Sequence, residues 1–188
     1  QIKSANTLVP TIDGWYATST DVSGFIWALA ANEVNNFETI QIIGAGGTAR
    51  AAAAAVDAPG RKITVISRTA SRETDMRNAV TLAELEFVEW REQELSADLV
   101  INTSPKGVAD IFASKQFASE GILFESLYDP WPTKLASNWQ GQVIDGLELL
   151  VHQAVEQLHL MTGFVIDRSQ MAKLLRVAGE AELKDRNA

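Results

Sequence analysis

The stretch Ile40-Gln-Ile-Ile-Gly-Ala-Gly-Gly-Thr-Ala-Arg50, which runs on into five alanines, decides the fold of this chain. A short apolar strand meets three glycines and then a run of strong helix formers. Gly44 allows a tight turn, Gly46 removes a side chain where a phosphate must approach, and Ala49 packs helix on strand. The N–H groups of the new helix then point at the anion, with the helix dipole behind them. The stretch therefore predicts a dinucleotide-binding unit.

The remaining sequence alternates short apolar segments with helical ones. Strands are expected at 2–9, 15–18, 39–43, 62–67, 86–90, 98–102, 122–127 and 142–144, and helices at 20–32, 48–56, 71–78, 147–161 and 168–178. The charged tail after residue 178 is expected to fray. Strands that alternate with helices imply a parallel sheet covered on both faces, so the fold class is α/β.

Composition excludes several classes of function. The chain has 188 residues, with 24 acidic and 16 basic side chains, a net charge of −8 and a pI near 4.8. This balance argues against binding to nucleic acid or to an anionic membrane, because both need a basic surface. The absence of cysteine excludes disulfides, thiolate catalysis and cysteine-ligated zinc. The two histidines, His152 and His159, share one apolar stretch, so no metal site is expected.

The sequence has no window that approaches 18 uninterrupted apolar residues, and no signal peptide is recognisable at its start. A cytoplasmic protein is therefore expected.

The end of the second expected strand of the dinucleotide unit indicates which cofactor binds. Units that bind NAD usually carry Asp or Glu there, to accept from the ribose hydroxyls. This chain has Ser67, followed by Arg68, Thr69 and Arg72. Two guanidiniums and a hydroxyl suit a 2′-phosphate, which a carboxylate would repel. Alternatively, both arginines are solvated charges at a helix start, although the dipole disfavours cations there. The pattern favours NADP over NAD.

Six separate blocks point, in the same order, to one known family. They are Ser4–Val9 with Asp13-Gly14, Thr20-Asp21 and Gly24-Phe25; Ile43–Arg50; Ser67-Arg68-Thr69 with Arg72; Asn102-Thr103-Ser104-Pro105 with Gly107; Tyr128-Asp129-Pro130 with Pro132-Thr133; and Gly146-Leu147 through Gln153. The series resembles the shikimate dehydrogenases over almost the whole chain, including their GAGGA-type loop and their Asn-Arg-Thr clamp for NADP.

The resemblance implies a Rossmann-type, doubly wound parallel sheet with helices on both faces, plus a remnant of an N-terminal substrate domain. It implies that residues 1–21 belong to that remnant and that 22–147 form the NADP-binding domain. Residues 148–188 would be C-terminal helices that pack back toward the substrate domain. The implied activity is NADP-dependent reduction of 3-dehydroshikimate to shikimate, by hydride transfer from the nicotinamide to a ring ketone.

The resemblance also carries site residues over by position. Asn6, Asp21, Tyr128 and Gln153 become contacts to the substrate, a polyol whose recognition requires buried carboxylate and amide groups. Asp21 becomes catalytic, because in this family its counterpart lies beside the lysine that handles the proton. The implied NADP positions are Gly44, Ala45, Gly46, Gly47, Thr48, Ser67, Arg68, Thr69, Arg72, Thr103, Ser126 and Gly146.

Simpler interpretations stay open for single residues. Asp21 is alternatively only a helix cap, Asn6 a strand-end polar group satisfied locally, and Asp145 a turn residue. His152 is interpreted as structural. Gln153 is harder to explain in this way, since an amide on an apolar helix face needs partners.

Three residues depart from the family pattern: Ser19 replaces an asparagine, Lys3 a common glycine, and Val108 a frequent methionine. Lys3 does not match the motif of the catalytic lysine, and the substrate domain that carries this motif is expected to be missing. The chain alone should then bind NADP but turn over shikimate poorly. Its orphaned strands 2–9 and 15–18 would be prone to pair with another chain, so a homodimer is an expected partner besides the small-molecule substrate.

Two other functions stay open. One is a quinate/shikimate relative with relaxed choice of substrate or cofactor, and the other is a non-catalytic NADP-binding module. Two-domain dehydrogenases of folates or glutamyl-tRNA lack the combination of Asn6, Asp21 and Gln153.

Overall fold

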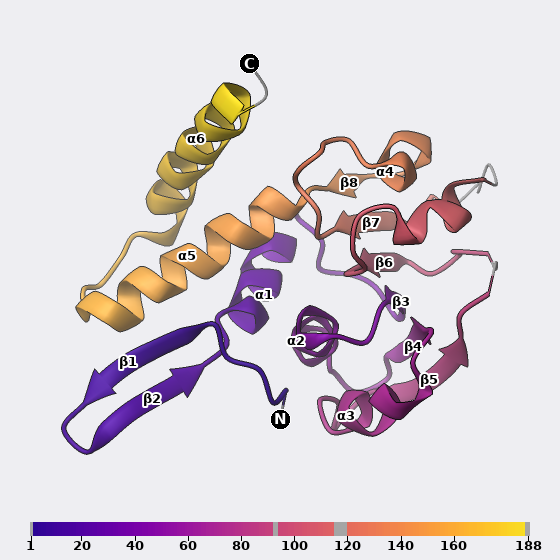
Figure 1. Ribbon diagram of the computed structural model, residues 1–188, viewed down its shortest axis with the longest axis horizontal. Helices are drawn as coiled ribbons and strands as arrows, with labels where there is room; N and C mark the ends of the chain where they lie inside the picture. Colours follow the sequence, from indigo (N-terminus) through magenta and orange to yellow (C-terminus); the bar gives the residue numbers. More distant parts are fainter. Residues whose placement is uncertain (1, 92–93, 115–119, 187–188) are drawn as a thin grey trace.

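The computed structural model describes residues 2–91, 94–114 and 120–186 and contains one parallel sheet and one separate hairpin (Figure 1). The sheet has six strands in the order β5-β4-β3-β6-β7-β8, and each neighbouring pair is parallel. The strands are β3 (Thr39–Ile43), β4 (Lys62–Ser67), β5 (Glu84–Glu89), β6 (Leu99–Asn102), β7 (Ile122–Glu125) and β8 (Val143–Ile144). The chain thus winds outward in both directions from the β3–β6 pair, and a doubly wound sheet binds its ligand at this reversal.

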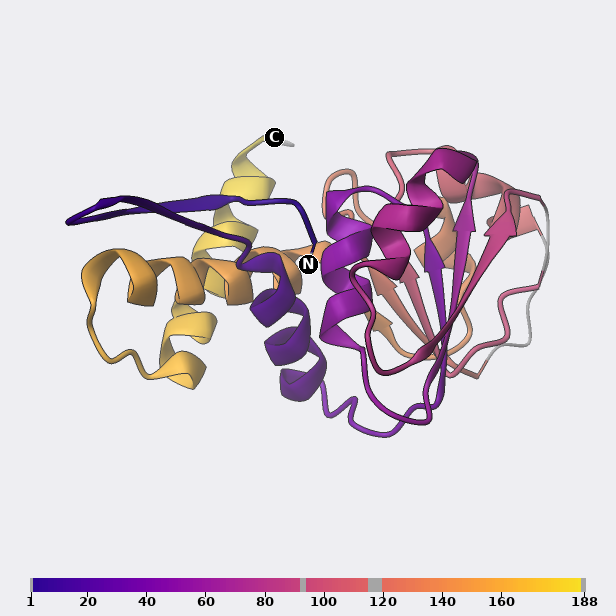
Figure 2. The same ribbon diagram turned by 90° about the horizontal axis from the view of Figure 1, so that it is seen from below.

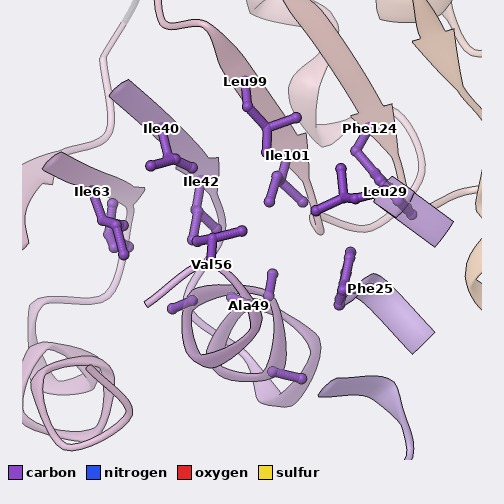
Figure 3. Packing of buried hydrophobic residues seen from close by; sticks show 14 of the residues in the cluster. Phe25, Leu29, Ile40, Ile42, Ala49, Val56, Ile63, Leu99, Ile101 and Phe124 are labelled. Carbon is purple, nitrogen blue, oxygen red and sulfur yellow. The ribbon is translucent and has the colours of Figure 1, made fainter. Parts of the chain in front are cut away.

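Helices cover both faces of the sheet, as expected. One face packs on α1 (Asp21–Ala31), α2 (Gly47–Ala55) and α3 (Glu73–Arg77), which follows the 3₁₀ helix η1 (Ala70–Arg72). Figure 3 shows the core of this face, where side chains of the strands, such as Ile42 and Ile101, lie opposite Phe25 of α1 and Ala49 of α2. The other face packs on the 3₁₀ helix η2 (Val108–Ser114) and on α4 (Lys134–Asn138).

The sequence of β3 explains its central place. Ile40 and Ile42 contribute to the core under α1 and α2, while Ile43 contributes to the core under η2 and α4. A strand buried on both faces has to be apolar along most of its length. On the first face, the buried alanines of α2 are small enough to let the helix lie close to the sheet.

The remaining elements gather at one end of the molecule. They are the antiparallel hairpin of β1 (Thr7–Thr11) and β2 (Gly14–Thr18), with α5 (Gly146–Thr162) and α6 (Arg168–Arg186). Figure 2 shows the hairpin, α6 and most of α5 on one side of α1, with the parallel sheet on its other side. Helix α1 therefore stands between the sheet and the hairpin end.

Two strands are shorter than expected by two residues or more, each for a local reason. The strand expected at 2–9 begins only at Thr7, because Lys3 has a φ of 46° and the carbonyl of Ile2 accepts from Arg50 Nε at 2.6 Å. The strand expected at 122–127 ends at Glu125, whose own side chain accepts the N–H of Leu127 at 3.2 Å. Both segments use their backbone groups outside the sheet.

Three helical segments also differ from the expectation. The charged tail continues α6 to Arg186 instead of fraying after 178, because Arg176–Glu180 and Glu182–Arg186 form ion pairs one helical turn apart. Residues 187–188 of that tail lie outside the described residues. The short helices η2 and α4 were not expected, since neither shows a helical pattern long enough to recognise. Within the described ranges, no helix is long and apolar enough to cross a membrane.

Candidate active site

Gly44 makes the turn between β3 and α2 possible. Its φ is +113°, and a Cβ atom there would lie 2.6 Å from Oγ1 of Thr103. Thr103 follows β6, and its hydroxyl and N–H both donate to the carbonyl of Ile43 at 2.9 Å. The N–H of Gly44 in turn donates to the carbonyl of Ile66 on β4, also at 2.9 Å. The glycine is therefore required where three strand ends converge.

Gly46 keeps the N-terminus of α2 open. It is the N-cap residue, and apart from Gly46 and its two chain neighbours no atom of the described residues lies within 4 Å of the position of a Cβ there. At Gly47, by contrast, a Cβ would lie 2.8 Å from Oγ of Ser4. The first N–H groups of a helix have no partner inside it and bind anions readily. Open space thus remains where a phosphate would approach, while Ser4 covers the neighbouring position.

The glycine loop forms one wall of a cavity of about 260 Å³ at the reversal point of the sheet. Its lining comprises Gly44, Ala45, Gly46, Ser67, Arg68, Thr69, Arg72, Trp90, Thr103, Ser104, Pro105 and Val108. Ser67 Oγ accepts the N–H of Thr69 at 3.2 Å, which shapes the turn after β4. A phosphate-accepting helix end and two guanidiniums therefore share one cavity, which suits a phosphorylated dinucleotide.

Trp90 was not predicted as a site residue. The Trp90 ring packs edge-on against the Phe112 ring, with 5.1 Å between the two ring centroids. The guanidinium carbon of Arg68 lies 5.5 Å from the centroid of the Trp90 ring. Such cation–π contacts hold an arginine in a defined place. The only signal in the sequence is an aromatic residue just after β5, beside the strand that carries the arginines.

The expected cofactor residues fall into three groups. Eight of them line the cavity, and Gly47 and Thr48 form the first turn of α2. Ser126 and Gly146 contact each other after β7 and β8, where a Cβ at Gly146 would lie 2.2 Å from the carbonyl oxygen of Ser126. Oγ of Ser126 is buried and has no hydrogen-bond partner within the described residues.

Three of the four expected substrate residues meet at the hairpin end. Nδ2 of Asn6 donates to Oδ1 of Asp21 and to Oε1 of Gln153, both at 2.9 Å. Oδ1 of Asn6 accepts the N–H of Thr20 at 2.9 Å, which fixes the orientation of its amide. The N-cap of α1 is Thr20, so Asp21 is the first residue of the helix and not its cap. A carboxylate and two amides from three distant segments thus form one polar cluster, the Asn6–Asp21–Gln153 cluster.

Gly24 allows this cluster to form. A Cβ at Gly24 would lie 3.2 Å from Cβ of Gln153 and 3.0 Å from Cδ1 of Leu149. A side chain at Gly24 would push its neighbours on α5 back by a few tenths of an ångström, so glycine favours this close approach of α1 and α5. The approach brings Gln153 of α5 to Asp21 of α1, and both to Asn6.

Burial raises the pKa of Asp21, and the hydrogen bond from Asn6 only partly offsets this effect. The side chain of Asn6 remains exposed, and Asp21 and Gln153 are half-buried, so the cluster is open to a ligand. A carboxyl group whose pKa lies closer to neutrality is better suited to exchange protons with a ligand.

Tyr128 lies elsewhere. It lines a cavity of about 310 Å³ that also includes Trp131, Leu147 and residues of α6.

Asp145 is the N-cap of α5, accepting from the N–H of Leu147 at 3.0 Å, and it forms an ion pair with Arg176 at 2.6 Å. This cap explains Asp145 without a role in ligand binding.

The buried His152 contacts Glu148 at 3.4 Å on its own helix, and this contact lowers the pKa of Glu148. A structural role fits this position. Within the described residues, no group of three or more histidine and carboxylate side chains is placed to hold a metal ion.

The segment 2–6 joins the cavity to the polar cluster. Arg50 of α2 holds its start through the carbonyl of Ile2, Ser4 lies over Gly47, and Asn6 is part of the cluster. Lys3 turns away to α3, where its Nζ lies 3.2 Å from Asp75 and lowers the pKa of that carboxyl. The two parts of the candidate site are thus only a few residues apart along one segment.

Comparison with known proteins gives a consistent result. Residues 146–176 match the family model described as the Shikimate 5'-dehydrogenase C-terminal domain. A relative from Maridesulfovibrio salexigens, named shikimate dehydrogenase (NADP(+)), is 28% identical over 184 residues, covering 93% of this chain and 66% of that protein. The chain thus spans slightly less than two thirds of this curated relative.

Two solved structures are also similar. The shikimate dehydrogenase of Mycobacterium tuberculosis is 32% identical with a TM-score of 0.80, over 93% of this chain and 69% of that chain. The shikimate 5-dehydrogenase of Thermus thermophilus, solved with NADP(H) and shikimate, is 26% identical with a TM-score of 0.73, over 94% and 69%. With its doubly wound sheet, its glycine loop and this level of identity, the chain belongs to the shikimate dehydrogenase family.

Proposed function

We propose that this chain is the NADP-binding part of an enzyme that reduces 3-dehydroshikimate to shikimate. In this proposal residues 22–147 bind the cofactor, residues 1–21 belong with the substrate domain, and residues 148–188 pack back toward that domain. The observation that carries the proposal is the Asn6–Asp21–Gln153 cluster, joined by one short segment to an open helix N-terminus. A polyol and a phosphorylated dinucleotide would then be bound side by side.

The cofactor residues divide the binding between them. The open N-terminus of α2 receives the pyrophosphate, and Arg68, Thr69 and Arg72 receive the 2′-phosphate. Thr103 borders the same cavity, and Ser126 and Gly146 extend the site along the strand ends. The bound NADPH supplies the hydride, and the residues of this chain orient it.

The substrate residues bind hydroxyl groups and manage a proton. Asp21 accepts from a ring hydroxyl, and the amides of Asn6 and Gln153 hold neighbouring hydroxyls. The raised pKa of Asp21 suits a group that exchanges a proton with the alkoxide as it forms. Tyr128 is a further proposed substrate contact, carried over from the family resemblance, and it lines the separate cavity beside α6. In the family, a lysine in the substrate domain completes this arrangement, and Lys3, paired with Asp75, does not replace it.

The function is tested by measuring NADPH oxidation with 3-dehydroshikimate. We expect the 188-residue chain to bind NADPH but to turn over at least about 1000-fold more slowly than a form extended N-terminally to the length of its curated relatives, as when one catalytic residue is removed. Equal turnover by the two forms would refute the assignment of the proton-handling lysine. An inactive extended form that binds NADPH would favour a non-catalytic NADP-binding module.

Arg68 should discriminate between NADP and NAD. We expect Arg68→Ala to raise the Kd for NADPH about 30-fold, because a charge-assisted contact to the 2′-phosphate is lost, and to change the Kd for NADH by less than about threefold. Fluorescence titration with each cofactor gives both constants. Arg77→Ala is the matched control, since Arg77 pairs with Glu73 on α3 at 2.7 Å, outside the cavity. Equal effects on the Kd values for NADPH and NADH would contradict the assignment of Arg68 to the 2′-phosphate. They would favour a quinate/shikimate relative with relaxed cofactor choice.

The hairpin supports self-association as a further part of the proposal. Leu8, Ile12, Trp15 and Tyr16 expose more than half of their surfaces on its two strands and turn. A two-stranded sheet with free edges and exposed apolar side chains readily pairs with another chain. A homodimer through β1 or β2 is therefore proposed for the isolated chain.

A further inference from the structure

Glu125 is a fully buried carboxylate at the end of β7, with an exposed fraction of 0%. Nδ2 of Asn102 donates to both of its oxygens at 2.9 Å, Oγ1 of Thr133 donates to Oε2 at 2.9 Å, and the N–H of Leu127 donates to Oε1 at 3.2 Å. Burial raises the pKa of Glu125 in spite of these bonds. Burying a carboxylate in this way costs free energy, so a specific advantage must keep it there.

The carboxylate determines which way the amide of Asn102 points. An ionised carboxylate only accepts hydrogen bonds, so Asn102 must direct its NH₂ group to Glu125 and its oxygen away from it. That oxygen accepts the N–H of Ser104 at 3.0 Å and Oγ of Ser104 at 2.7 Å. Ser104 is itself buried and lines the 260 Å³ cavity with Thr103 and Pro105. Glu125 thus orients the amide of Asn102, and this amide holds Ser104 in the cavity wall.

The same carboxylate holds a second loop. Thr133 donates to Glu125 and accepts the N–H of Ala136 at 3.1 Å, so it caps α4 from a fixed position. The bond from Leu127 fixes the turn that follows Ser126 and precedes Tyr128. The loops 102–105 and 126–133 thus meet at one buried side chain.

We propose that Glu125 is a positioning residue for cofactor binding, which acts through Asn102 and Ser104 to hold the Thr103–Pro105 wall of the cavity. The proposal rests on the proposed function for its ligand, NADPH, but the positioning of the wall stands on its own contacts. Glu125 itself does not line the cavity.

A reciprocal exchange of the two side chains tests this inference. Asn102→Asp would place two carboxylates in contact and should raise the Kd for NADPH about tenfold or more. Glu125→Gln should also weaken binding, because an NH₂ group would then face the donors. In the double variant Asn102→Asp with Glu125→Gln, the new amide NH₂ donates to the new carboxylate, so one of the two hydrogen bonds between these positions returns in the opposite direction, and Ser104 stays bonded to an oxygen. We expect its Kd to return to within about threefold of the wild-type value.

Two further measurements make the result decisive. Hydrogen exchange of the peptide 103–108 without cofactor should speed up in Asn102→Asp and slow down again in the double variant. Thr133→Val is the control, because it removes one hydrogen bond to Glu125 and the cap of α4 but keeps the hydrogen bonds between Asn102 and Glu125. This variant should lower the free energy of unfolding and leave the Kd for NADPH unchanged.

The outcomes separate this inference from the proposed function. If the folded Asn102→Asp variant binds NADPH and exchanges like the wild type, or if the double variant restores neither, the positioning role is overturned. If the wild type binds no NADPH but the exchange of 103–108 follows the predicted order, the positioning of the wall is supported and the cofactor assignment fails.

Discussion

Replacing Gly46 with valine is expected to raise the Kd for NADPH about 100-fold while the fold stays intact. Apart from Gly46 and its two chain neighbours, no atom of the described residues lies within 4 Å of a Cβ at this position, and the φ of −82° suits any residue. The new side chain would instead fill the space in front of the α2 N-terminus, where the pyrophosphate has to approach. Overpacking between the valine and the bound pyrophosphate would cost about 3 kcal/mol. Only the complex with NADPH would lose this free energy, so the Kd rises.

The measurement is a fluorescence titration with NADPH, accompanied by urea unfolding. The free energy of unfolding should fall by no more than about 1 kcal/mol, because valine is a poorer N-cap than glycine. Gly46→Ala should give an intermediate Kd. Ala54→Val, a β-branched change later in the same helix, should leave binding unchanged. Wild-type affinity in Gly46→Val would mean that the pyrophosphate does not lie against this helix.

Gly146→Ala is expected to lower the free energy of unfolding by about 2 kcal/mol or more. A Cβ at Gly146 would lie 2.2 Å from the carbonyl oxygen of Ser126 and 2.9 Å from the carbonyl carbon of Leu127. These are backbone atoms, so the start of α5 has to move away from the loop after β7. The clash costs about 3 kcal/mol. Alanine returns less than the roughly 1 kcal/mol that it gains over glycine in a helix interior, because Gly146 is the first residue of α5.

Gly179→Ala provides the matched control within α6. A Cβ there would lie 2.9 Å from Cδ1 of Leu147, which is the end of a flexible side chain and can move aside. The propensity gain of about 1 kcal/mol should then make this variant as stable as the wild type or more stable. Urea unfolding of the two variants compares them directly. If both glycines tolerate alanine equally, the contact between α5 and Ser126 is looser than described.

Much of the fold was predictable from local patterns. The apolar strand before Gly44 and the alanine-rich helix after it are short-range signals, and the structure confirms the doubly wound sheet that they indicate. The patterns failed where a side chain competes with the backbone. Glu125 ends β7 early by binding the N–H of Leu127, and ion pairs prolong α6 beyond 178. Such contacts depend on the geometry of the individual side chain, which a hydrophobic pattern does not contain.

The candidate site was predictable only in part, for a related reason. The family resemblance named Asn6, Asp21 and Gln153 without showing how residues so far apart in sequence would meet. It missed Trp90 and Glu125 altogether, since a single aromatic residue just after β5 or a single carboxylate at the end of β7 is too weak a local signal to mark a site. Tyr128 shows the opposite case, because it was named with the cluster and lies in a different cavity.

The sequence by itself determined the α/β class, the glycine turn before α2 and the arginines after β4, because each depends on residues close together in the chain. Only the tertiary structure decided that Gly24 brings Gln153 to Asn6 and that Glu125 orients Asn102 under the cavity wall. These contacts join residues 23 to 147 positions apart. They form only after the sheet and helices have packed. Burial strengthens a hydrogen bond between distant segments, so that it offsets the conformational entropy lost when both segments are ordered.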